Sequence, residues 1–253
     1  MKKLLLSVVV LCCAALWGNA LSVTNPLYMP EEGQFLFGAD AAFKDDSGGN
    51  KDSYFYKATV SYNTSDRLQL GGYVGYAYLS KETPKRDDFT NPGAFAYFRI
   101  LDNIVKLDIG AEGEFDAFDN VAQGGVADGA NKYTGILRAG ADLKALSFGA
   151  IGSVSYWDMD SSAGYIHSDM VNTEAKAFII FDVFDVFGIG AEGGYKAFNT
   201  NRDDHWHSKY ITARLDINPL PSRLGVLLYA TTEDNENNSH TDFAFGVQAR
   251  LVI

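Results

Sequence analysis

The stretch Leu107-Asp108-Ile109-Gly110-Ala111-Glu112-Gly113-Glu114-Phe115-Asp116 alternates apolar with polar residues almost without a break. One set of alternate positions reads Leu, Ile, Ala, Gly, Phe, and the other reads Asp, Gly, Glu, Glu, Asp. Successive side chains of a β-strand point to opposite faces, so this strand has one apolar face and one charged face. Charges in the middle of a strand need water, whereas an unbroken apolar face can contact lipid. The stretch therefore predicts one strand of a closed membrane barrel with a polar lumen.

The same alternation recurs along the chain and predicts about twelve strands. The expected fold class is all-β: a transmembrane, antiparallel, up-and-down β-barrel. Connections after odd-numbered strands are long and polar, and those after even-numbered strands are short, as in barrels with short periplasmic turns and longer extracellular loops. The expected strands are residues 34–44, 53–63, 68–79, 93–101, 104–118, 132–143, 146–158, 172–183, 187–198, 207–217, 224–232 and 241–253.

The beginning of the chain has the pattern of a secretory signal peptide. Lys2 and Lys3 precede an apolar run, and small residues follow at Gly18-Asn19-Ala20, which is the order that signal peptidase recognises. The expected organisation is a signal peptide at 1–20, a periplasmic N-terminal lead at 21–33 and a transmembrane β-barrel at 34–253.

The lead contains Pro26 and Pro30, which interrupt strand pairing. It is expected either to extend into the periplasm or to be tucked into the mouth of the barrel.

Composition narrows the class of protein further. Both cysteines, Cys12 and Cys13, lie in the signal peptide, so the mature chain has no disulfide to hold it. A closed barrel needs none, because closure pairs every backbone N–H and C=O group. The chain has 21 basic and 32 acidic residues, which argues against nucleic-acid binding. After the signal peptide, no apolar run reaches the length of a transmembrane helix.

The alternation also predicts which charged residues face the lumen. Basic and acidic side chains occur there in similar number, and rings of charge beside a narrow water path would select small solutes by charge and size. Alternatively, opposite charges could pair across the lumen and close it. Glycines at inward positions are expected to leave space inside. The predicted lumen-lining residues are Asp40, Lys57, Arg99, Lys106, Asp108, Glu112, Glu114, Arg138, Asp142, Glu174, Lys176, Glu192, Lys196, Arg214, Asp216 and Arg250.

The histidines give no catalytic or metal-binding pattern. Asp203, His205 and His207 alternate in a loop, and a solvated loop is the expected role of this cluster. His207 and Ser208 are adjacent, so on a strand they would point to opposite sides and could not act as a base and nucleophile. We expect no catalytic residues, no metal and no cofactor.

With its export signal, its cysteine-free mature part and its alternating last strand at 241–253, the chain resembles Gram-negative outer-membrane β-barrels. The resemblance covers residues 34–253. It implies location in the outer membrane, contact with the lipid bilayer and lipopolysaccharide, and insertion by the barrel-assembly machinery. The chain departs from those proteins in ending at Ile253 rather than at an aromatic residue. It also has no His-x-Ser, the arrangement of the outer-membrane phospholipase.

The expected function is that of a porin-like channel for the passive diffusion of small hydrophilic solutes, and not of an enzyme. Two alternatives remain at this point. One is a structural or surface-interaction barrel with a salt-bridged, closed lumen, and the other is a hydrolase at the rim near His205. In the channel hypothesis the residues expected to matter most are Arg99, Glu112, Arg138, Glu192 and Arg214.

Overall fold

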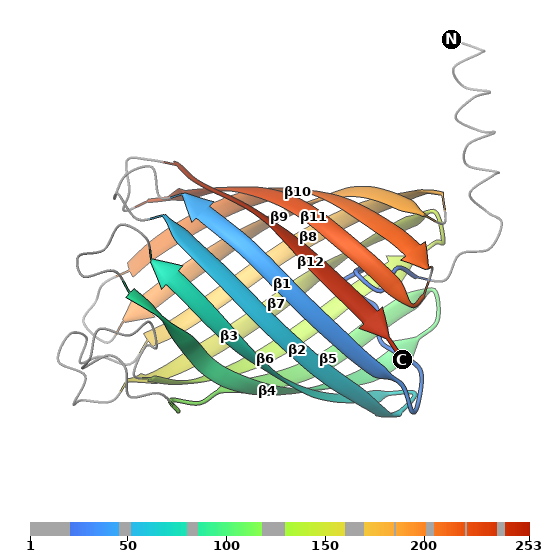
Figure 1. Ribbon diagram of the computed structural model, residues 1–253, viewed down its shortest axis with the longest axis horizontal. Helices are drawn as coiled ribbons and strands as arrows, with labels where there is room; N and C mark the ends of the chain where they lie inside the picture. The colour runs from blue at the N-terminus through green and yellow to red at the C-terminus, as the bar shows by residue number, and fades with distance from the viewer. Residues whose placement is uncertain are drawn as a thin grey trace, which may run out of the picture.

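The computed structural model describes residues 21–45, 52–79, 86–117, 130–159, 170–184, 186–200, 205–220, 222–236 and 241–253. Within them, twelve antiparallel strands form one closed up-and-down barrel (Figure 1). Each strand pairs with its neighbours in sequence, and β12 pairs with β1. The prediction of a twelve-stranded all-β barrel is confirmed. The strands are β1 (Phe35–Asp45), β2 (Ser53–Ser65), β3 (Leu68–Leu79), β4 (Arg86–Asp102), β5 (Val105–Glu114), β6 (Ala130–Asp142), β7 (Leu146–Met159), β8 (Met170–Phe184), β9 (Phe187–Thr200), β10 (His205–Leu220), β11 (Leu224–Asn235) and β12 (Thr241–Val252).

The two faces of the strands differ as the alternation predicts. On β12, Phe243, Phe245 and Val247 are exposed on the outside of the barrel, whereas Asp242 is buried on the inside. On β5, Ile109 is exposed and its neighbour Asp108 is buried. Large apolar side chains exposed around a closed barrel need an apolar surrounding, which lipid provides.

Two strand boundaries differ clearly from the expectation. β4 begins at Arg86 instead of residue 93, because a β-bulge accommodates Pro92: the register passes from Tyr73 opposite Gly93 to Gly75 opposite Thr90. β5 ends at Glu114, earlier than the predicted 118, and the next residue donates its backbone N–H to the Pro92 carbonyl at 3.0 Å. The bulge thus lengthens one strand and ends its partner.

The two ends of the barrel are unlike, and we name them for their connections. At the turn end, short connections such as 103–104 and 143–145 join the strands, and the C-terminus lies there (Figure 1). At the loop end, the strands lead into segments outside the described residues. No helix in the described ranges is long and apolar enough to cross a membrane.

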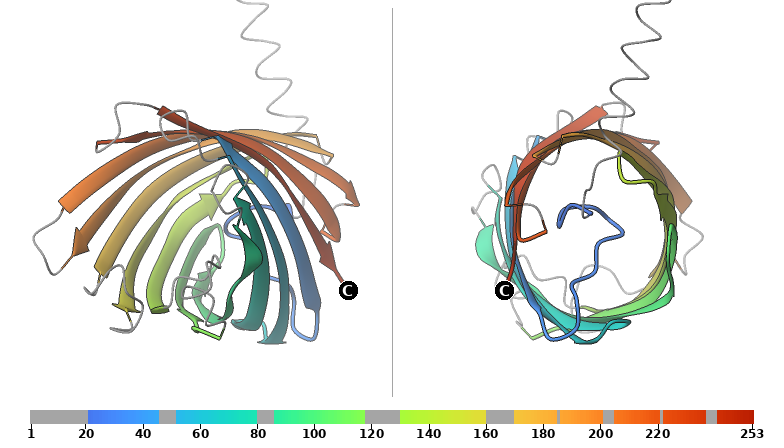
Figure 2. Two further views of the ribbon diagram at one scale, coloured as in Figure 1. Left: turned by 60° about the vertical axis from the view of Figure 1, so that its left-hand side comes forward. Right: turned by 90° about the vertical axis from the view of Figure 1, so that its right-hand side faces the viewer.

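The segment before β1, residues 21–33, lies inside the turn end of the barrel, and we call it the plug. Viewed along the barrel, it crosses the interior of the ring (Figure 2, right). Val23, Thr24, Asn25 and Leu27 are at most 2% exposed, so this part of the chain is as buried as a protein core. Of the two placements that the sequence left open, the structure has the segment tucked into the barrel. The predicted signal peptide at 1–20 lies outside the described residues.

Candidate functional site

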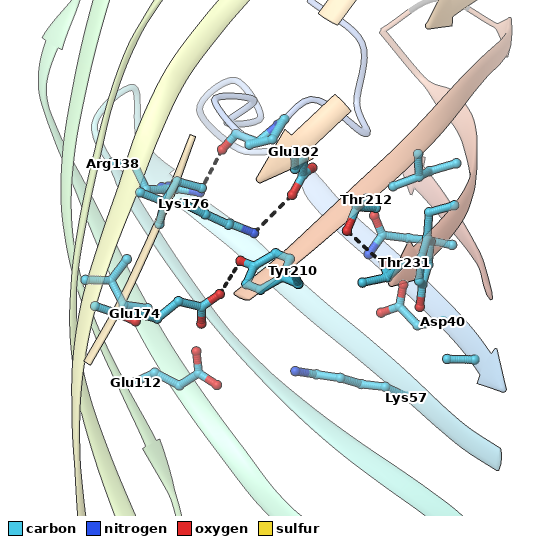
Figure 3. A pocket seen from close by; sticks show the side chains of 18 of the residues that line it. Asp40, Lys57, Glu112, Arg138, Glu174, Lys176, Glu192, Tyr210, Thr212 and Thr231 are labelled. Carbon is cyan, nitrogen blue, oxygen red and sulfur yellow. Dashed lines mark hydrogen bonds and ion pairs between the residues drawn. The ribbon is translucent and has the colours of Figure 1, made fainter. Parts of the chain in front are cut away.

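A cavity of about 820 Å³ occupies the lumen above the plug, that is, between the plug and the loop end. Thr24 and Pro26 of the plug form part of its floor, and inward side chains of the strands form its wall. Figure 3 shows charged side chains converging on this space from several strands, with Lys57 extending toward Glu112. The lumen is therefore a wet, charged chamber, and the plug narrows its turn end.

Ten of the sixteen predicted lumen residues line this cavity, and six do not. Arg99, Asp108 and Asp216 are buried at the turn end beside the plug. Lys106 pairs with Asp102 at 2.7 Å, Asp142 accepts the backbone N–H of Lys144 at 3.0 Å, and Glu114 pairs with Lys132 at 3.2 Å. The ten lining residues are Asp40, Lys57, Glu112, Arg138, Glu174, Lys176, Glu192, Lys196, Arg214 and Arg250.

The ion pairs above the plug follow the wall of the barrel. Lys176 on β8 pairs with Glu192 on β9 at 3.4 Å, and Arg214 on β10 pairs with the same carboxylate at 2.6 Å. Lys132 on β6 pairs with Glu114 on β5. Since these partners lie on neighbouring strands, they neutralise one another without bridging the lumen. Pairing of opposite charges, taken alone, does not close this half of the barrel.

At the turn end, four arginines from four different strands hold the plug by its backbone carbonyls. Arg99 on β4 donates to Leu27 at 2.6 Å, and Arg214 on β10 donates to Thr24 at 2.9 Å. Longer bonds of 3.3 Å join Arg138 on β6 to Pro26 and Arg250 on β12 to Val23. The acceptors are therefore Val23, Thr24, Pro26 and Leu27. Guanidinium groups suit this arrangement, because each offers five donors and can bind a carbonyl and a carboxylate together.

Carboxylates complete the anchoring. Asp108, on β5, pairs with Arg99 at 2.8 Å and with Arg138 at 3.1 Å. Asp216, on β10, pairs with Arg214 at 2.7 Å and accepts the Thr24 hydroxyl at 2.5 Å. Arg99, Arg138 and Arg214 thus each have a buried carboxylate as partner, which offsets the cost of burying their charges.

Apolar contacts secure the two sides of the plug. Val23 packs with Leu36 and Val252, and Leu27 packs with Phe178 and Ile180. These are the buried apolar clusters of the described residues, and both contain a plug residue. Without the plug the turn end would expose these apolar groups to water.

Tyr28 also lies at the edge of the plug. Burial, with a smaller contribution from the charge of Glu31, raises the pKa of Tyr28 to about 12. The docked plug therefore favours the neutral phenol.

Inward glycines have a different role from the one expected. Gly110 is opposite Tyr97, Gly194 is opposite Tyr210, and an added Cβ at either glycine would overlap the facing aromatic ring. The same holds for Gly246 and Tyr229. These three glycines thus do not leave empty space, because an inward tyrosine on the neighbouring strand occupies it. The parity of the alternation could have revealed these tyrosines, which sequence reasoning missed as lumen residues.

The residues considered for a rim hydrolase do not come together. Ser208 is buried and donates to Glu233 at 2.7 Å, whereas His207 stacks on Tyr195 with ring centroids 5.3 Å apart. His205 is exposed and bonds Asn199 at 2.8 Å. Asp203 and Asp204 lie outside the described residues.

Solved structures with the same architecture are outer-membrane proteins. An outer membrane channel from Pseudomonas putida F1 superposes with a TM-score of 0.68 at 10% identity, covering 92% of this chain and 100% of that chain. The two chains share the twelve-stranded barrel fold. The NanC porin matches with a TM-score of 0.59 at 10% identity, covering 85% and 98% of the two chains. OmpT of Vibrio cholerae matches with a TM-score of 0.50 at 8% identity, covering 89% and 99%. Neither protein-family models nor curated protein sequences give a match.

Proposed function

We propose that this protein is a porin-like channel of the bacterial outer membrane through which small hydrophilic solutes diffuse passively. The observation that carries the proposal is the cavity of about 820 Å³, enclosed by a barrel with an apolar outside and charged inside. Ion pairs between neighbouring strands neutralise charges along the wall and do not cross the centre of the lumen. The architecture shared with solved outer-membrane channels supports the same reading.

In this proposal the turn end faces the periplasm and the loop end faces the outside. Short turns on the periplasmic side, and termini there, are the usual arrangement of such barrels. Contact with lipopolysaccharide and insertion by the barrel-assembly machinery belong to the proposal, as does the absence of enzymatic activity. The Ser208 hydroxyl, bonded to Glu233, has no histidine base beside it in the described residues, which supports this last point.

The experiment is to refold the purified protein into planar lipid bilayers and record single channels. Discrete unitary conductance steps are expected. A barrel that is folded, as judged by its heat-modifiable migration on gels, but electrically silent would refute the proposal.

A second candidate is a structural or surface-interaction barrel whose lumen stays closed. The plug favours it, because this segment crosses the turn end and is buried there. A silent wild type that conducts only after removal of residues 22–28 would support this candidate over the channel.

A further inference from the structure

The side chains that line the main cavity carry a net positive charge, whereas the chain as a whole is acidic. The sequence carries a formal net charge of −11, yet the wall of the main cavity has seven cationic and four anionic side chains. This differs from the even balance expected from the alternation, because several predicted inward acids, including Asp108 and Asp216, lie buried at the turn end. The cations are Lys57, Lys132, Arg138, Lys176, Lys196, Arg214 and Arg250, and the anions are Asp40, Glu112, Glu174 and Glu192.

Two of these cations differ from the rest in their partners. Lys132, Lys176, Lys196 and Arg214 all pair with carboxylates within 4.0 Å. The ion pairs among the described residues include neither Lys57 nor Arg250. Lys57 lies over the Tyr73 ring, 3.5 Å from its centroid. Arg250 donates one bond, of 3.3 Å, to the Val23 carbonyl.

Arg138 is the third cation that, like Lys57 and Arg250, lines both the main cavity and a smaller one beside it. It shares Asp108 with Arg99 through its Nη2 atom, and its guanidinium carbon lies 4.1 Å from the centroid of the Tyr97 ring. Its Nε atom has no hydrogen-bond partner among the described residues. Asp40 and Glu112 are the acidic residues that line both cavities. Asp40 lies directly opposite Lys57 in the register of β1 and β2, and the Glu112 carboxylate accepts the Tyr73 hydroxyl.

The same residues mark the entrance to a second, smaller cavity beside the plug. This cavity of about 200 Å³ shares Asp40, Lys57, Glu112, Arg138 and Arg250 with the main one. Along β1 and β3 it reaches Leu36 and Gln69, each the second residue of its strand at the turn end. The arginine bonds to the plug come from β4, β6, β10 and β12, and on β2 Asn63 donates to the Pro30 carbonyl. Residues of β1, β2 and β3 form much of the wall of the smaller cavity.

We propose that Lys57, Arg138 and Arg250 form an anion-binding subsite where the two cavities meet, and that the channel prefers small carboxylates. The inference rests on the proposed channel function and names its solute class. A carboxylate matches the planar, multiple donors of a guanidinium, and among the described residues Arg250 donates only to the Val23 carbonyl. A surplus of positive charge at a narrow point also raises the local concentration of anions.

Single-channel recording of the refolded full-length protein under a KCl gradient tests the subsite. The reversal potential should show that chloride permeates more readily than potassium. Arg250→Gln should keep conducting and should lower the chloride-to-potassium permeability ratio several-fold, while Arg250→Lys should preserve the anion preference. Lys196→Gln is the matched control, because it removes the same charge from a residue paired with Glu233 in the wider part of the lumen. It should change the ratio little.

Block of the chloride current by succinate is the second test. Added to one side, succinate should reduce the chloride current of the wild type at a concentration that leaves Arg250→Gln unaffected, and inorganic phosphate in parallel tells a carboxylate site from a general oxyanion site. A channel that conducts but prefers cations would overturn the subsite and not the channel function. Equal changes of the chloride-to-potassium permeability ratio in Arg250→Gln and Lys196→Gln would do the same. Block by phosphate but not by succinate would overturn the carboxylate preference. Complete absence of conductance would instead overturn the channel function itself.

Discussion

The loop-end half and the turn-end half of the lumen are formed by the same twelve strands but are filled in different ways. Above the plug, lysines and glutamates pair along the wall and a large cavity remains. At the turn end, four arginines donate to the carbonyls of Val23, Thr24, Pro26 and Leu27, and buried aspartates pair with three of these arginines. The barrel wall therefore bounds the lumen, while a short non-strand segment fills its turn end.

The largest expected effect on conductance comes from removing the plug, which is what distinguishes the two halves of the lumen. Deletion of residues 22–28 should raise the unitary conductance several-fold, because the cavity would then continue through the turn end. Planar-bilayer recording measures it, with Glu32→Ala, an exposed position before β1, as the control. An unchanged conductance in the folded deletion variant would show that the plug does not lie in the conducting path.

Ion pairs in the two halves should also differ in their contribution to stability. Arg99→Gln leaves the buried Asp108 with one cation fewer and should lower the free energy of unfolding by about 3–5 kcal/mol, the usual cost of breaking a buried pair. Lys176→Gln removes a more exposed partner of Glu192 and should cost at most about 1 kcal/mol. Urea titration of the protein folded into vesicles, followed by tryptophan fluorescence, gives both values. Equal losses would contradict the division into two halves.

A smaller change to the plug should loosen it without removing it. Leu27 is fully buried against Phe178 and Ile180, so Leu27→Ala should weaken docking by about 2–5 kcal/mol. We expect brief openings to a higher conductance in single-channel traces. Val60→Ala, an exposed position on the outer face of β2, is the control and should leave the traces unchanged. If Leu27→Ala traces matched the wild type, the apolar contacts of Leu27 would not hold the plug.

The smallest effect concerns Tyr28 and alkaline pH. Docked, its pKa is raised to about 12, whereas a released tyrosine ionises near its ordinary value of 10.0. The neutral form is the docked form, so docking is unaffected below pH 10 and weakens as the pH rises toward 12. Conductance of the wild type should therefore rise over this range more than that of Tyr28→Phe. Identical pH profiles would remove Tyr28 from the docking equilibrium.

Much of the fold could be predicted from the sequence, because a period of two assigns each residue to a face whatever lies around it. The strand count and the outward positions of Phe243, Phe245 and Val247 follow from that period. The early start of β4 did not follow, since a proline predicts a strand break and only the bulge at Pro92 shows how pairing continues. The candidate site was predictable in part: alternation gives the direction of a side chain, but not its partner.

The sequence alone determined an all-β barrel with an apolar outside and a charged inside, because successive side chains of a strand point to opposite faces and backbone pairing in lipid requires closure. Only the tertiary structure decided what fills the barrel. Tyr97 and Tyr210 cover Gly110 and Gly194 from adjacent strands, and four arginines far apart in sequence meet one buried segment. Those contacts depend on the register between strands and on the path of residues 21–33, and neither is set by a pattern within one strand.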